Sequence, residues 1–275
     1  MIKDIVVNLS LGARDPAGDY AVSMAEACDA HVLGVAFAYE PVIPGSAMGG
    51  IPAEFLDAQR REAGDKARMA MARFTEAAKR AGVTAETRIL EASISGAADQ
   101  LGHLARRFDI AVVGQPPREH PAAEEVVDEG VLFESGRPVV FVPFIHQGGM
   151  KLTHVMVCWD GSRAATRAIA DSLPLLKKAK TVEIVIVAGK PAKSDDVPGA
   201  DLGQHLARHG LKVDIKRITS PEIDVASTIL SYAADSDADM IVTGGYGHSR
   251  LREFVLGGVT RGLLQSMTVP VLMSH

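Results

Sequence analysis

The pattern that most constrains the fold is an alternation of short β-branched segments with longer helical segments, which occurs twice along the chain. In each half, five segments rich in Val and Ile are separated by stretches whose apolar residues recur at helical spacing. The Val/Ile segments are nearly continuous in apolar residues, as is typical of strands buried on both faces of a parallel sheet. The sequence therefore predicts two tandem doubly wound α/β domains, each with a five-stranded parallel sheet.

The predicted strands are 4–9, 31–38, 84–90, 110–113 and 139–142 in the first half, and 154–159, 181–188, 212–218, 240–243 and 269–273 in the second. Predicted helices include 55–81, 97–107, 164–177 and 225–234. The segment Asp109–Gly114 parallels Asp239–Gly244, and each is followed by a helix and a Pro-Val strand. We interpret this match as an internal duplication with domains at 1–146 and 151–275. A single bilobed domain is the alternative left open.

Length and composition agree with two globular domains. The chain has 275 residues, 47% hydrophobic and 23% charged, so each half can bury a core. A net charge of -5 and few aromatic residues disfavour nucleic-acid binding. No apolar stretch approaches the roughly 20 residues of a membrane span, and no signal-peptide pattern is seen at the N-terminus. Two distant cysteines, Cys28 and Cys158, fit neither a disulfide framework nor a zinc site, so we expect a cytoplasmic protein with reduced thiols.

Glycines in the second half predict a phosphate site. The strand ending at Thr243 runs into Gly244-Gly-Tyr-Gly247, and after nine residues Gly257-Gly-Val-Thr260 opens a helix. Glycines let backbone N–H groups approach an anion, and a helix N-terminus adds unsatisfied donors and partial positive charge. In an open α/β sheet, the loop after the first strand faces the same crevice. That loop contains Asp160, which could bind ribose hydroxyls or magnesium, or simply cap the next helix in competition with Ser162.

These residues resemble the universal stress protein family. The spacing from Gly244 to Gly257 is similar to that family's nucleotide-binding motif, 157–162 (Val-Cys-Trp-Asp-Gly-Ser) to its first-strand motif, and 269–273 to its last strand. The resemblance covers nearly all of residues 151–275 and extends to 1–145 through strand order alone. It implies a Rossmann-like, adenine nucleotide-binding type of domain, pairing of domains through the last strand, and ATP held in the crevice in one branch of the family.

By position, the resemblance assigns ATP, alone or with magnesium, to the C-terminal half. Asp160, next to Trp159, would meet the ribose or metal side, and Val187 and Ala188 would line the adenine pocket. Thr243, Gly244, Tyr246 and Gly247 would contact ribose and inner phosphates, and Gly257, Gly258 and Val259 the outer ones. Gly258 stands where the family has Ser or Thr, so a hydroxyl contact is missing unless Thr260 replaces it.

The first half keeps the strands but lacks the motif. Its first-strand loop is Ser10-Leu-Gly12, and its fourth strand ends in Gly114-Gln-Pro-Pro117, where the prolines remove N–H donors. Acidic residues then follow, at Glu119, Glu124, Glu125, Asp128 and Glu129. We therefore expect a degenerate domain that repels ATP and pairs with the second domain. We also expect two whole chains to associate as a homodimer.

Three functional hypotheses follow. The leading one is a stress-response module that binds ATP for regulation or sensing, with at most slow hydrolysis, because no nucleophile with its base and no Walker lysine accompany the site. The alternatives are a nucleotide-free scaffold for protein partners and, less favoured, an AMP-transferring enzyme. Weaker candidates are His205 with His209 as metal ligands, His248 and Arg250 as phosphate contacts, and Cys158 as a redox sensor; each has a structural explanation as well.

Overall fold

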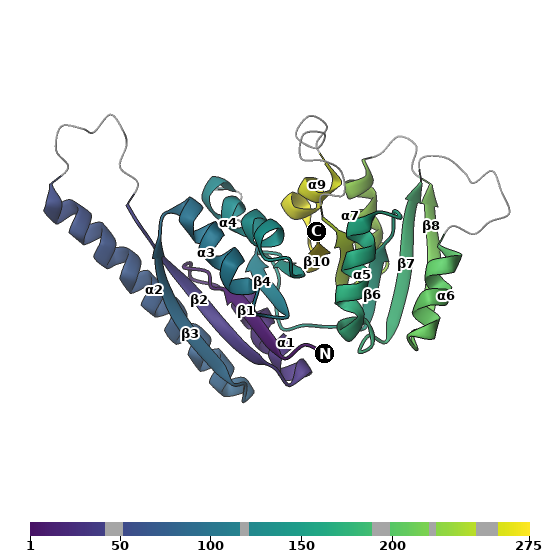
Figure 1. Cartoon of the computed structure of the whole chain (residues 1–275), viewed down its shortest axis with the longest axis horizontal. Helices are drawn as coiled ribbons and strands as arrows, with labels where there is room; N and C mark the ends of the chain where they lie inside the picture. Colours follow the sequence, from purple (N-terminus) through teal and green to yellow (C-terminus); the bar gives the residue numbers. More distant parts are fainter. Residues whose placement is uncertain (42–51, 116–120, 189–198, 220–223, 246–257) are drawn as a thin grey trace. The chain divides into compact units, whose positions relative to one another are not determined.

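The computed structural model describes residues 1–41, 52–115, 121–188, 199–219, 224–245 and 258–275, with the side chains of 121–125 and 128 left aside. The chain divides into two compact units (Figure 1). Unit 1 comprises Met1–Ser135 and Gln147–Gly149, and unit 2 comprises Gly136–His146 and Met150–His275. Each unit alternates strands with helices, which confirms the predicted doubly wound α/β fold class.

Unit 1 contains a parallel sheet of strand order β3-β2-β1-β4. Its elements are β1 (Asp4–Asn8), α1 (Pro16–Cys28), β2 (His31–Tyr39), α2 (Ala53–Ala81), β3 (Ala85–Ala92), α3 (Ile94–Ala105), β4 (Ile110–Gly114) and α4 (Pro121–Glu134). The central strands are buried along their length, whereas β3 alternates between exposed and half-buried residues, as expected of an edge strand. The apolar core therefore lies under β1, β2 and β4.

Unit 2 has the strand order β5-β10-β9-β6-β7-β8. Its elements are β5 (Val139–Val142), β6 (His154–Cys158), α5 (Arg163–Leu176), β7 (Thr181–Ala188), α6 (Ala200–Arg208), β8 (Val213–Thr219), α7 (Val225–Asp235), β9 (Met240–Gly244), α9 (Val259–Ser266) and β10 (Val271–Ser274). The five strands of the second half run parallel to one another. Strand β5, predicted as the last of the first half, pairs antiparallel with β10 and clusters with unit 2.

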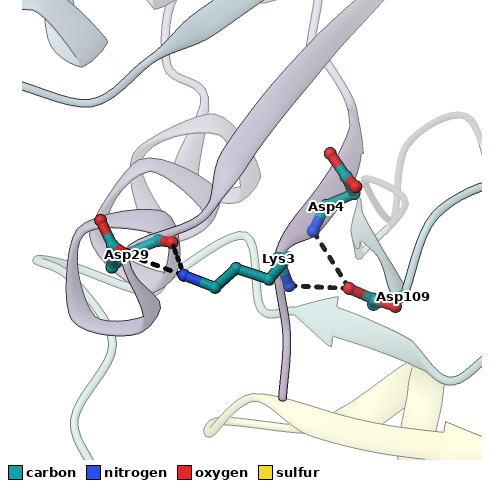
Figure 2. A network of polar contacts seen from close by, with 4 residues as sticks. All are labelled: Lys3, Asp4, Asp29 and Asp109. Atoms are coloured by element: carbon teal, nitrogen blue, oxygen red, sulfur yellow. Dashed lines mark hydrogen bonds and ion pairs between the residues drawn. The ribbon is translucent and has the colours of Figure 1, made fainter.

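An aspartate ties the start of β1 to the start of β4 in unit 1. Asp109 Oδ2 accepts hydrogen bonds from the backbone nitrogens of Lys3 (2.7 Å) and Asp4 (3.1 Å). Figure 2 shows these bonds together with the ion pair from Lys3 Nζ to Asp29 (2.7 Å). A carboxylate that accepts two N–H bonds fixes how the two neighbouring strands begin.

The same arrangement recurs in unit 2. Asp239 Oδ2 accepts from the backbone nitrogens of Thr153 (2.7 Å) and His154 (2.9 Å), at the start of β6. The Asp239 nitrogen in turn donates to the His154 carbonyl at 2.9 Å, as the Asp109 nitrogen does to the Asp4 carbonyl. Since Asp109 and Asp239 are the residues that align the two halves in sequence, the internal repeat extends to individual hydrogen bonds.

Candidate functional site

The turn between β6 and α5 forms one side of the candidate site. Asp160 is exposed, and its Oδ1 accepts a hydrogen bond from the Ser162 nitrogen at 2.9 Å. Gly161 has φ +76°, a left-handed conformation that favours glycine. Ser162 Oγ accepts from the Ala165 nitrogen at 3.1 Å, so Ser162 is the N-cap of α5. Asp160 therefore shapes the turn while its carboxylate faces solvent.

The end of β9 forms the opposite side. A Cβ added to Gly244 would lie 2.7 Å from the carbonyl carbon of Ala164 and closer still to the Ala165 nitrogen. Strand β9 thus meets the first turn of α5 backbone to backbone, which only glycine allows. Thr243, just before, is buried, and the Gly245 nitrogen donates to the Ser274 carbonyl of β10 at 2.9 Å. The structure therefore brings the Asp160 turn and the start of the glycine segment together.

Helix α9 contributes backbone donors. It begins after Gly258, which has no side chain to cap the helix, and its first N–H groups point toward the N-terminal end. Val259 is half-buried at the first helical position, and Thr260 is 4% exposed on the same turn. Gly262 packs against α7, because a Cβ there would lie 2.8 Å from that of Ala226. The packing of α7 thus holds α9 in place.

The remaining predicted residues lie at strand ends or outside the described part of the chain. Val187 and Ala188 are half-buried at the end of β7, and Trp159 continues β6 by donating from its nitrogen to the Val185 carbonyl at 2.9 Å. The predicted contacts Tyr246, Gly247 and Gly257, with His248 and Arg250, fall outside the described residues. Their roles stay predictions.

In unit 1 an arginine lies at the loop after the first strand. Arg73 of α2 donates to the carbonyl oxygens of Ser10 (2.7 Å) and Gly12 (2.8 Å). Its guanidinium also lies 3.9 Å from Asp15 Oδ2. Asp15 caps α1 by accepting from the Gly18 nitrogen at 3.0 Å, and burial raises the pKa of this carboxyl to about 6. Sequence analysis missed Arg73, because nothing in the pattern of α2 distinguishes it from the other charged residues there.

The last helices of the two units differ in length. Gly130 of α4 and Gly262 of α9 each lie four residues before the end of their helix, and each packs closely against an alanine of another helix, Ala98 of α3 or Ala226 of α7. Helix α4 has 14 residues and α9 has 8, so α4 starts six residues earlier relative to this common point.

The weaker candidates differ in their surroundings. Cys158 is buried, and desolvation followed by the nearby Asp160 charge raises the pKa of its thiol to about 12. This thiol is therefore neutral, unlike a redox-sensing thiolate. The His205 and His209 rings stand edge to face at 4.8 Å. Across the described residues, no group of at least three His, Cys, Asp or Glu side chains is placed to hold a metal ion, and no helix has the length and apolarity to cross a membrane.

Comparison with known proteins gives the family of the second unit. Residues 151–275 match the universal stress protein family. A universal stress protein of Synechocystis sp. is 25% identical over 180 residues, covering 63% of this chain and 60% of that protein's length. A universal stress protein structure from Archaeoglobus fulgidus matches with a TM-score of 0.70 at 17% identity, covering 98% of this chain and 94% of that chain.

A second similar structure comes from a different kind of protein. The cytoplasmic domain of a prokaryotic cation chloride cotransporter matches with a TM-score of 0.51 at 13% identity, covering 99% of this chain and 95% of that chain. Likeness at such identities concerns the fold alone, because one fold serves several functions. The family match rests instead on residues 151–275, where the glycine segments and the Asp160 turn lie. The C-terminal part of this chain is therefore a universal stress protein family domain.

Proposed function

We propose that unit 2 binds an adenine nucleotide, ATP with or without magnesium, at the carboxyl ends of β6 and β9. The observation that carries the proposal is the contact of Gly244 with the first turn of α5, which joins the Asp160 turn to the start of the glycine segment. Ligands of open α/β sheets bind outside the carboxyl ends of the strands, where these two features meet.

Chemical complementarity supports a nucleotide at this place. The exposed Asp160 carboxylate is suited to ribose hydroxyls or to a magnesium ion. The N-terminus of α9, which begins after Gly258, supplies N–H groups and partial positive charge suited to a phosphate. Val187 and Ala188, half-buried at the end of β7, offer an apolar surface suited to the base. The same proposal includes the Thr260 hydroxyl, which would replace the one that is missing at Gly258.

We further propose a regulatory or sensing role with at most slow hydrolysis. The thiol beside the site, Cys158, is neutral, and the nearby Asp160 carboxylate is exposed, with no nucleophilic side chain bonded to it in the described contacts. Unit 1 would act as a partner domain without ATP. Its own loop after β1, which corresponds to the Asp160 loop of unit 2, is already bound by Arg73. A homodimer of the whole chain is part of this proposal and is checked by light scattering.

The test is to denature freshly purified protein and identify released nucleotide by mass spectrometry, followed by calorimetry with ATP and magnesium. We expect about one nucleotide per chain, and its loss in an Asp160→Ala, Gly247→Val double variant. Asp214→Ala, which removes an exposed carboxylate on the edge strand β8, is the matched control and should retain binding. No nucleotide and no calorimetric binding would instead favour the nucleotide-free scaffold.

A further inference from the structure

A buried polar contact joins α5 to the last strand of unit 2. Ser274, 1% exposed at the end of β10, donates from Oγ to Asp171 Oδ2 of α5 at 2.9 Å. The same oxygen accepts from Arg167 Nε at 3.0 Å, and the Arg167 guanidinium also donates to the Gly136 carbonyl at 2.9 Å. Asp171 therefore links α5 to β10, and Arg167, from which it accepts, links α5 to Gly136 before β5.

Ser274 is adjacent to the candidate site through the sheet. It is the register partner of Gly244, and its carbonyl accepts from the Gly245 nitrogen at 2.9 Å. Because Gly244 in turn contacts the first turn of α5, the end of β9 is held by α5 from one side and by β10 from the other. The Ser274–Asp171 bond closes this arrangement by attaching β10 to the same helix.

The corresponding positions of the first half are apolar. Asp171 lies nine residues after the N-cap Ser162, and Met24 lies nine residues after the N-cap Asp15. Ser274 is the fourth residue of its strand, as Val142 is of β5. Met24 and Val142 are both fully buried. An apolar side chain at each of these positions is thus compatible with burial, and a buried polar pair generally adds less stability than an apolar one.

We propose that Asp171 and Ser274 are positioning residues of the nucleotide site, which hold the Gly244–Gly245 end of β9 in register with the Asp160 turn on α5. The inference rests on the proposed function, because a positioning role presupposes that unit 2 binds a nucleotide. The contacts of Asp171 and Ser274 do not depend on that function. Removing the bond weakens the attachment of β10 to α5, so the first backbone groups of the glycine segment are held less firmly. The affinity for the nucleotide should therefore fall by more than the loss of folding stability of unit 2 would cause by itself.

The test compares two buried serines. Ser274→Ala removes the bond to Asp171, whereas the control Ser172→Ala removes a bond of similar length, 3.0 Å from Ser172 Oγ to the Ile169 carbonyl, within α5 itself. We expect the ATP dissociation constant of Ser274→Ala to rise about tenfold or more, the scale of losing a hydrogen bond to a charged group. Ser172→Ala should bind ATP as the wild type does. Asp171→Asn, which keeps an oxygen acceptor, should lie between Ser274→Ala and the wild type.

A second measurement needs no nucleotide. Amide hydrogen exchange at Gly245, whose N–H donates to Ser274, should accelerate in ligand-free Ser274→Ala and Asp171→Ala but not in Ser172→Ala. Equal exchange and equal affinity in both serine variants overturn the proposal, as does an equal loss in both. If the wild type binds no ATP, the proposed function fails, and the exchange of Gly245 still decides whether these residues position the glycine segment.

Discussion

At the scale of single residues, Asp15 makes unit 1 sensitive to pH. Burial raises the pKa of its carboxyl from 3.8 to about 6, against hydrogen bonds from the Gly18 and Ser10 backbone and the Arg73 charge. Because the folded state holds the proton more tightly, this group adds stability below pH ~4 that is lost as the pH rises through ~6. Its contribution to the free energy of unfolding should change by about 2 kcal/mol over that range.

Replacing Asp15 with Asn tests this dependence. Asn keeps a side-chain oxygen for the N-cap bond to Gly18, but it does not ionise. Urea unfolding between pH 4 and 7 should therefore give a flatter profile for Asp15→Asn than for the wild type. Asp99→Asn, at an exposed residue of α3 that does not contribute to the shift of Asp15, is the control and should leave the profile unchanged. Parallel profiles for Asp15→Asn and the wild type would contradict the assignment.

At the scale of elements, close helix packing depends on glycine. A Cβ on Gly130 of α4 would lie 2.7 Å from the Ala98 Cβ of α3, so Gly130→Ala should lower the free energy of unfolding by about 1–3 kcal/mol through overpacking. Gly64 of α2 offers the matched control, since its nearest neighbour is the flexible Arg68 side chain at 3.4 Å. Gly64→Ala should stabilise by about 0.5–1 kcal/mol through helix propensity. Urea unfolding measures both, and changes of the same sign would refute the packing argument.

The strands were the features that could best be predicted from the sequence. All ten predicted strands are present, because buried parallel strands combine β-branched runs with flanking turn residues. The direction in which β5 pairs could not be predicted, since a local pattern identifies a strand but not its neighbour. Within the site, Asp160 and Gly244 were found because they lie in short motifs. Arg73 and the Ser274–Asp171 bond were missed because their partners lie 61 to 103 residues away.

At the scale of the whole molecule, the repeated aspartates predict that each unit has its own anchor. Asp109→Ala should accelerate amide exchange at the start of β1 and leave β6 unchanged, and Asp239→Ala should do the reverse. Each should lower stability by about 1–3 kcal/mol, because two N–H groups lose a charged acceptor. Exchange measured peptide by peptide distinguishes this result from the contrary one, in which either variant loosens both units together.

The antiparallel pairing of β5 with β10 determines where the chain can be cut. The family match begins at residue 151, but β5 ends at Val142 and fills the hydrogen-bonding edge of β10 through pairs such as Phe141 with Val271. A recombinant fragment that starts at the family boundary would leave that edge bare, with unpaired N–H and C=O groups ready to recruit another copy or to aggregate. A fragment that starts before Gly136 would keep β10 paired with β5.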